Sequence, residues 1–93
     1  MRQIDRSSAF KRDYKRESKG QYRATLDQDL IPVLHALANN ESLAIHYRDH
    51  DLIGHWAGYR ECHVKPDLLL IYRKVDDHLL RLARLGSHSQ LFG

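Results

Sequence analysis

Residue types that are used in acid–base catalysis gather in two segments of the sequence, residues 48–67 and 86–93. These segments contain four of the seven histidines, carboxylates and a terminal aromatic residue: His50, His55, His63, His88, Glu61, Asp67 and Phe92. An imidazole with a pKa of about 6.5 exchanges protons near neutral pH, and an adjacent carboxylate can raise that pKa or orient the ring. An aromatic ring offers a stacking surface for a nucleobase. The combination favours chemistry on a phosphodiester, with a scatter of unrelated surface histidines as the alternative.

The chemistry that suits these residues best is cleavage of RNA without a metal ion. RNA carries its own nucleophile, the 2′-OH. The enzyme must supply a base for that hydroxyl, an acid for the departing 5′-oxygen and cations for the charge on phosphorus. Two histidines and an arginine meet these needs. We therefore expect no cofactor and no metal, and a 2′,3′-cyclic phosphate as the product end.

Other catalytic sites fit the sequence less well. His50, His55 and His63 lack the spacing of a zinc motif, and the single cysteine, Cys62, excludes a Cys-based zinc site and an internal disulfide framework. Cys62 alternates with apolar residues, which predicts a core position rather than a nucleophile. The absence of a glycine-rich phosphate loop argues against nucleoside triphosphate chemistry.

The length of 93 residues predicts a single domain, residues 1–93, with a small core. A deep active-site cavity is not expected in so short a chain, so a substrate would lie on an open face. The sequence contains neither a long apolar run nor the apolar segment of a signal peptide. We therefore expect a cytoplasmic protein that does not associate with a membrane.

The formal net charge is +3, and it is unevenly distributed. Residues 2–23 contain eight Lys or Arg against three Asp or Glu, a local charge of +5. A basic element of this kind attracts phosphate backbones. The candidate contacts to ribosomal RNA or other phosphates are Lys11, Arg12, Lys15, Arg16 and Lys19. An acidic protein partner or a plain solvated helix face would also account for the pattern.

The first half of the chain predicts a strand and two helices. Residues 2–6 form the strand, and a helix begins at Ala9, after an N-cap at Ser7 or Ser8, and ends near Gly20. Apolar residues at helical spacing predict a second helix that ends at Ala38. Pro32 is best tolerated in its first turn, which would make Asp29 the N-cap. The alternative is a longer helix from residue 21 with a kink at the proline.

The second half predicts a loop over residues 41–54, with room for one short helical turn, and then strands at 55–64, 68–74 and 79–85. Alternation in the first of these strands places Tyr59, Glu61 and His63 on one face and Trp56, Arg60, Cys62 and Val64 on the other. Short turns between strands require antiparallel pairing. The order β-α-α-β-β-β indicates an α+β fold, with a two-helix hairpin packed on a small, mainly antiparallel sheet.

The C-terminal half also resembles a known family. The pattern runs from the first candidate histidine to the last residue, with fixed spacing: Asp49, His50, Leu52, Gly54, Trp56, Gly58, Tyr59, Arg60, His63, Val64, Pro66, Asp67, Ile71, Tyr72, Arg84, Gly86, His88, Leu91, Phe92 and Gly93. It resembles the YafQ toxins of the RelE superfamily, the toxin halves of bacterial toxin–antitoxin pairs. The N-terminal half agrees with that family mainly in the order of its elements.

The resemblance implies a compact microbial-ribonuclease fold of the RelE type. It also implies a type II toxin that cleaves mRNA in the decoding site of the ribosome, in contact with 16S rRNA, with a preference for adenine-rich codons. The implied partner is a DinJ-like antitoxin with a ribbon-helix-helix DNA-binding half, and operator DNA would be contacted only through the complex with that antitoxin.

The family's catalytic set carries over onto His50, His63, Asp67, His88 and Phe92, while Glu61 stands where the family has an Asp. From the chemistry, His50 and His88 are the best base and acid candidates, in either order. Asp67 and His63 would orient a histidine or stabilise charge, Phe92 would stack on a base, and the substrate contacts would include Glu61, Arg60 and Arg84. Alternatively, Arg60 is structural and Phe92 fastens the tail to the core.

Two other functional classes remain open. A gyrase-directed toxin of the related ParE branch would share the fold but would not need the histidines and aspartate. A non-catalytic nucleic-acid-binding module would use only the basic first helix. Substitution of His88 separates both classes from a nuclease, because only a nuclease loses its effect.

Overall fold

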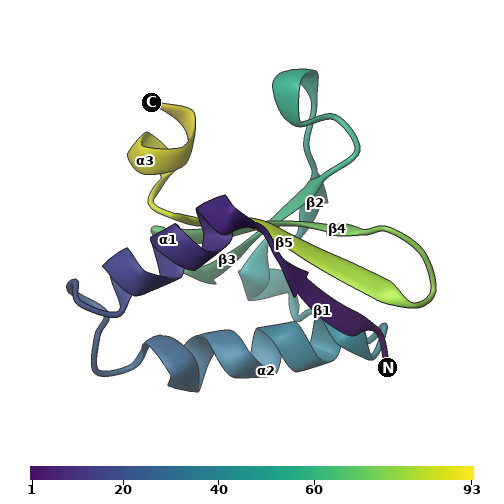
Figure 1. The fold of residues 1–93 in the computed structure, drawn as a ribbon, viewed down its shortest axis with the longest axis horizontal. Coiled ribbons are helices and arrows are strands. Elements are labelled where there is room, and N and C mark those ends of the chain that lie inside the picture. Colours follow the sequence, from purple (N-terminus) through teal and green to yellow (C-terminus); the bar gives the residue numbers. More distant parts are fainter.

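A five-stranded sheet organises the computed structural model, which describes residues 1–93 (Figure 1). The strand order is β1-β5-β4-β3-β2, with bounds β1 Gln3–Arg6, β2 His50–Asp51, β3 Arg60–Lys65, β4 Leu68–Lys74 and β5 Leu79–Gly86. All neighbouring strands are antiparallel except β1, which pairs with β5 in parallel. The predicted α+β fold with a mainly antiparallel sheet is confirmed.

The predicted N-cap of helix α1 (Ser8–Glu17) is confirmed at Ser7, whose hydroxyl accepts a hydrogen bond from the Phe10 amide at 2.9 Å. The helix begins at Ser8 rather than Ala9, and it ends at Glu17, before Gly20. Helix α2 (Leu26–Ala38) contains Pro32 in its interior. The predicted N-cap at Asp29 is therefore wrong: the cap is Thr25, and the Asp29 amide already donates to the Thr25 carbonyl.

Burial explains why α2 tolerates its proline. The helix places a continuous apolar stripe in the core: Leu26, Leu30, Val33, Leu34 and Leu37. Starting at Asp29 would expose Leu26, whereas the proline removes one backbone hydrogen bond, to the carbonyl of Gln28. Gln28 is exposed, so water can satisfy that carbonyl.

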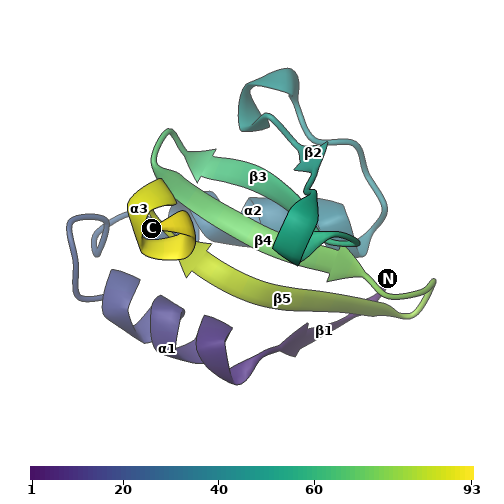
Figure 2. The same ribbon diagram turned by 90° about the horizontal axis from the view of Figure 1, so that it is seen from above.

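Two apolar clusters lie on opposite faces of the sheet. The larger joins Phe10 of α1 and the stripe of α2 to Cys62, Leu70, Tyr72 and Leu82. The smaller joins Leu69, Ile71 and Ala83 of the sheet to Leu91, with Trp56 and Tyr59 packed against it. Figures 1 and 2 show α2 below the sheet, α1 along β5, and α3 with the segment before β3 above it. Cys62 is a core residue, as the sequence predicts.

The sequence predictions for the segments flanking β3 need correction. The strand begins at Arg60 rather than residue 55, because a 3₁₀ turn occupies Gly54–Trp56. That turn interrupts the alternation, so the prediction that Trp56 shares a face with Cys62 is wrong; Trp56 packs on the opposite face. The predicted loop contains a 3₁₀ turn, Ile45–Tyr47, and the short edge strand β2.

The end of the chain is a helix rather than an irregular tail. Helix α3 (His88–Phe92) is closed at its start by reciprocal hydrogen bonds between Ser87 and Gln90, of 3.2 Å and 2.8 Å. Such a capping box satisfies amides at the start of a helix that would otherwise lack partners. It fixes α3 directly above the end of β5. None of the helices is long and apolar enough to span a membrane.

Candidate active site

Strand pairing places the candidate residues in a row across one face of the sheet. His50 pairs with Glu61, Glu61 with Ile71, and Ile71 with Arg84. Residues that pair across strands project from the same face. Ile71 belongs to the smaller cluster, so His50, Glu61 and Arg84 lie on the face opposite α2. We call this set, extended by His63, Asp67 and His88, the catalytic row.

Glu61 lies between two histidines of the catalytic row. Its Oε1 is 3.6 Å from Nε2 of His50 and 3.5 Å from Nε2 of His63. Nδ1 of each ring lies near a backbone carbonyl, at 2.7 Å from Arg48 and 3.1 Å from Pro66. The carbonyls can only accept, so Nδ1 carries a proton and Nε2 is the nitrogen that can exchange one. A proton taken up at either Nε2 forms an ion pair with Glu61.

The carboxylate of Glu61 is buried, whereas the two histidine rings beside it are more exposed to solvent. Glu61 is 8% exposed, His63 19% and His50 51%. A shielded carboxylate interacts more strongly with neighbouring charge than one in bulk water. The sheet thus holds a negative charge beneath two rings that a substrate can reach.

Asp67 and His88 meet at the other end of the catalytic row. An oxygen of Asp67 accepts a hydrogen bond from the backbone amide of His88 at 3.0 Å, which fixes the first residue of α3. The rings of His88 and Phe92 contact edge to face, with centroids 5.2 Å apart, and Phe92 is 41% exposed. A hollow of about 360 Å³ is lined by Asp67, His88, Ser89, Phe92 and Gly93. Asp67 therefore positions α3 through the backbone rather than by contact with an imidazole.

A second hollow, of about 310 Å³, adjoins His63. It is lined by His46, Arg48, His63, Val64, Lys65 and Pro66. His46 and Arg48 were not among the residues predicted from the sequence. Their signal was their place just before the motif, within the segment predicted to be a loop. They add a cation and a fourth imidazole beside the three histidines of the row.

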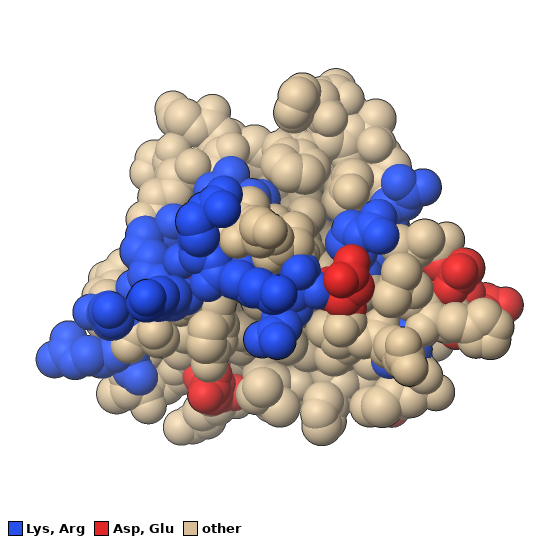
Figure 3. Space-filling view, in the orientation of Figure 1, with Lys and Arg blue, Asp and Glu red and all other residues tan.

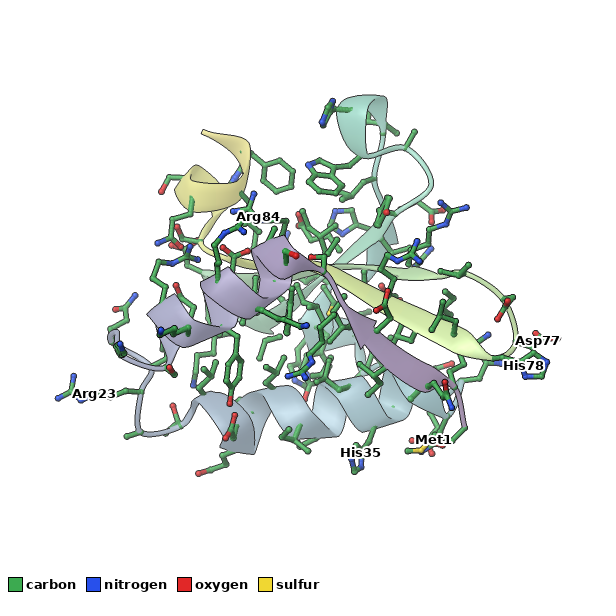
Figure 4. All side chains as sticks on the ribbon, in the orientation of Figure 1. Met1, Arg23, His35, Asp77, His78 and Arg84 are labelled. Atoms are coloured by element: carbon green, nitrogen blue, oxygen red, sulfur yellow. The ribbon has the colours of Figure 1, made fainter.

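Arg84 reaches the catalytic face because of an irregularity in β5. Ile71 pairs with Arg84 but its neighbour Tyr72 pairs with Leu82, so Ala83 is an extra residue in the strand. Such a bulge shifts the alternation by one position. Arg84 donates to Asp13 on α1 through Nε at 2.7 Å and Nη2 at 3.3 Å. Figure 4 shows Arg84 at the base of α3, beside α1.

Arg60 lies outside the catalytic row. It pairs with Tyr72 of the larger cluster, and its guanidinium binds Asp49 at 3.1 Å and Asp51 at 2.6 Å. The hydrogen bond to Asp49 outweighs partial burial and raises the pKa of Arg60. This geometry matches the structural alternative for Arg60, since its charge is already balanced.

The basic residues of α1, together with Lys19 in the turn that follows it, form a separate surface. Lys11, Arg12, Lys15 and Lys19 are exposed and make no ion pair, whereas Arg16 binds Asp13 at 2.8 Å and Glu17 at 2.9 Å. Figure 3 shows Lys and Arg side chains spread along α1 on one side of the molecule. Four of the five predicted phosphate contacts are thus free cations, and the fifth is occupied within the fold.

The largest cavity, about 680 Å³, lies beyond the end of α2 and contains no member of the catalytic row. Two of its cations already have partners: Arg60 binds Asp49 at 3.1 Å, and Lys74 donates to Asn40 at 3.1 Å. The candidate catalytic side chains therefore lie on the open face of the sheet rather than in this cavity.

Comparison with known proteins places the whole chain in one family. Residues 2–93 match the family model described as "Bacterial toxin of type II toxin-antitoxin system, YafQ". The mRNA interferase toxin YafQ of Escherichia coli K12 is 39% identical over 92 residues, covering 97% of this chain and 99% of that protein.

Solved structures agree with this match. The crystal structure of YafQ from E. coli BL21(DE3) superimposes with a TM-score of 0.85 at 39% identity, over the full length of both chains. A crystal structure of the E. coli DinJ–YafQ complex gives 0.83 at 40% identity, again over both full lengths. The fold of the present chain is therefore that of the YafQ structures.

Proposed function

The chain belongs to the YafQ family of bacterial type II toxins and is an mRNA interferase, an endoribonuclease toxin, and we propose that it cleaves mRNA on the ribosome by attack of the substrate's own 2′-OH. One observation carries the chemical part: Glu61 lies within 3.6 Å of Nε2 of both His50 and His63. The arrangement supplies the proton-exchanging groups that general acid–base catalysis requires, and it places a shielded carboxylate beside them.

The proposed division of labour follows the catalytic row. His50 and His88, the two exposed histidines of the row, serve as base and acid, in either order. His63 and Glu61 stabilise charge beside His50, Asp67 holds α3, and Arg84 faces the charge that develops on phosphorus. Phe92 stacks on a nucleobase next to the scissile bond. Attack in line leaves a 2′,3′-cyclic phosphate and a 5′-hydroxyl, and no metal ion takes part.

Ribosome dependence is supported by what surrounds the row. The row lies on an open face, with hollows of only about 310 and 360 Å³ beside it, so the protein alone has few walls to hold RNA in the reactive geometry. Correct positioning can contribute several kcal/mol to a reaction. We propose that the decoding site supplies it in the cytoplasm, that the free cations of α1 bind 16S rRNA, and that adenine-rich codons are preferred.

We propose a DinJ-like antitoxin as the neutralising partner. The structures that support this are complexes of DinJ with YafQ of E. coli. A ribbon-helix-helix half would bind operator DNA, so the toxin would approach DNA only within the complex. An acidic, initially disordered segment of the antitoxin is suited to the basic α1. Co-purification with the product of the neighbouring gene tests this, and a toxin that remains monomeric would contradict it.

The decisive experiment is primer extension on an mRNA programmed on ribosomes, with and without the protein. Cleavage is expected only when ribosomes are present, and a single 2′-H at the cleavage site should abolish it while ribosome binding persists. His88→Ala should lower the rate by about 10²-fold or more. Equal cutting of naked RNA would refute ribosome dependence. Cutting of the 2′-deoxy substrate would refute the mechanism, and full toxicity of His88→Ala would favour a non-catalytic binder.

A further inference from the structure

Asp13 is a buried acid on α1 that the proposed cleavage chemistry does not use. It is 3% exposed, and it accepts hydrogen bonds from three sources. These are Arg84 Nε at 2.7 Å, Arg16 Nη1 at 2.8 Å and the Leu85 amide at 3.0 Å. A charge so far from solvent is costly unless its partners are well placed. Here every partner comes from α1 or from the end of β5.

Arg84 presents two different edges. Nε and Nη2 donate to Asp13, while Nη1 makes no hydrogen bond within the protein. Arginine is suited to such a double role, because its planar guanidinium carries five N–H donors in a fixed fork. Arg84 lies on the catalytic face, separated from Glu61 only by Ile71 in the strand register. The Nε–Nη2 edge of Arg84 is therefore held by Asp13, and the Nη1 edge is free to donate to a substrate near the row.

Asp13, which holds Arg84, is itself fixed by further hydrogen bonds. Arg16 bonds Asp13 and also donates to the Leu85 carbonyl at 2.8 Å, while the Leu85 amide donates to Asp13. Asp13 is thus fixed to the backbone next to the arginine that it holds. Stability alone is a weak reason for such a cluster, since apolar replacements of buried ion pairs are often neutral or stabilising.

We propose that Asp13 is a positioning residue that orients Arg84, so that the free edge of its guanidinium faces the phosphate at the scissile bond. The inference rests on the proposed function, because it takes RNA as the substrate. It assigns an acid on the first helix, far from the catalytic motif in sequence, to the alignment of a cation in the row.

The first test is kinetic. Asp13→Asn keeps the shape of the side chain but removes its charge. On programmed ribosomes we expect kcat to fall by about tenfold or more, less than the roughly 10²–10³-fold cost of deleting a transition-state donor. KM should stay near the wild-type value, because a loss confined to kcat reports an interaction made in the transition state. Asp5→Asn is the matched control: it breaks an exposed pair with Arg81, also on β5, at 3.1 Å.

The second test asks whether the effect passes through Arg84. If Asp13 acts by orienting Arg84, the double variant Asp13→Asn/Arg84→Ala should be no slower than Arg84→Ala alone. Losses that multiply would overturn the proposal, as would Asp13→Asn with wild-type kcat. If Asp13→Asn does not fold, Arg84→Lys replaces it, because a lysine keeps the charge but not the fork. A fully active Arg84→Lys would then overturn the proposal.

A spectroscopic readout separates this proposal from the function on which it rests. The Nε–H of Arg84 should give a slowly exchanging NMR signal in the wild type and in Asp5→Asn, and lose that protection in Asp13→Asn. If the wild type does not cleave mRNA, the proposed function fails, while this signal still reports whether Asp13 orders Arg84. An unprotected Arg84 signal in the wild type would refute the positioning role.

Discussion

Glu61 lies close to the rings of two histidines, His50 and His63. One of its oxygens lies 3.6 Å from His50 Nε2 and 3.5 Å from His63 Nε2, distances longer than a hydrogen bond but short for charges. The carboxylate therefore acts on both rings electrostatically. In the proposed mechanism, Glu61 stabilises whichever of the two rings accepts the proton.

Replacing Glu61 by Gln should separate catalysis from stability. Glu61→Gln retains the volume but removes the buried charge, so we expect the cleavage rate to fall by about 10²-fold, on the scale of a positioned acid–base group. The melting temperature should stay the same or rise, since no buried charge needs compensation. Single-turnover cleavage and thermal unfolding measure the two effects. Glu41→Gln, at an exposed position, is the control, and a wild-type rate in Glu61→Gln would contradict this role.

Asp13 should govern part of the acid stability. Its burial opposes ionisation, but hydrogen bonds from Arg84, the Leu85 amide and Arg16 outweigh it and hold its pKa below the usual value. The unfolded chain therefore takes up the proton first, at about pH 4. The stabilisation from this group is complete above that pH and is lost as the pH falls through the lower folded pKa.

Denaturant unfolding between pH 2 and 6 tests this directly. Asp13→Asn should be less stable than the wild type near pH 6, and its stability should fall less steeply below about pH 4. Asp5→Asn should retain the wild-type steepness. Parallel pH profiles for the wild type and Asp13→Asn would show that the folded-state pKa of Asp13 is not depressed.

At the scale of elements, the sequence predicts most where a pattern depends only on neighbours in the chain. The apolar run of β4 and the tight turn before β5 place both strands to within a residue. The predicted start of α2 was wrong because of Pro32. Burial of Leu26 outweighs the cost of the proline, and that burial depends on tertiary packing, which a local pattern does not show. Periodicity also cannot locate a bulge. Strict alternation from Leu80 and Leu82 places Arg84 toward the larger core, and only the extra residue Ala83 turns it to the catalytic face.

The candidate site was predictable in its residue types but not in its contacts. The sequence places Glu61 and His63 on one strand and Asp67 just after the turn that follows it. The pairing of β2 with β3 then brings His50 next to Glu61, which the sequence does not show. Asp13 carried one weak signal: it follows Phe10 by three residues, so it lies on the buried face of α1. Its partners come from residues 84 and 85, a separation that local pattern cannot bridge.

Gly86 links β5 to α3 and should resist substitution. A Cβ at this position would lie 2.8 Å from both Arg16 Nη2 and Gln90 Oε1, and 3.3 Å from Leu91 Cδ2. Gly86→Ala should therefore displace these side chains, at a cost of about 1–3 kcal/mol for overpacking, and loosen the base of α3. We expect faster hydrogen exchange in residues 87–93 and slower cleavage. Gly20→Ala, whose Cβ meets nothing closer than 3.6 Å, should leave both unchanged; equal effects of the two variants would refute the packing argument.

At the scale of the whole molecule, the proposed binding surface and the proposed catalytic row are separate. Lys and Arg side chains spread along α1 on one side of the molecule (Figure 3). Strand pairing places the catalytic row on the face of the sheet over which α3 lies in Figure 1. Asp13 faces inward from the helix whose outer side carries these cations. The same helix can thus bind a large anionic partner on its outer side and hold Arg84 on its inner side. This division predicts that surface charge affects association, whereas the row affects turnover.

Lys11→Gln combined with Lys15→Gln tests that division, because it removes two free cations of α1 without touching an ion pair of the fold. We expect KM for ribosome-dependent cleavage to rise and kcat to stay near its wild-type value, since uniform binding is weakened. The dependence of log KM on log salt should become shallower, because fewer counterions are released on binding. The slope should change by roughly one unit for each phosphate that the variant no longer neutralises.

Arg23→Gln supplies the comparison for a single surface charge outside α1; Figure 4 shows Arg23 projecting from the turn between α1 and α2. Its effect on KM and on the salt slope should be clearly less than half that of the α1 pair. If Arg23→Gln, which removes one charge rather than two, had half the effect of the pair, net charge alone would govern association. A fall in kcat without a change in KM would instead place Lys11 or Lys15 in the chemical step, and the division between the two surfaces would not hold.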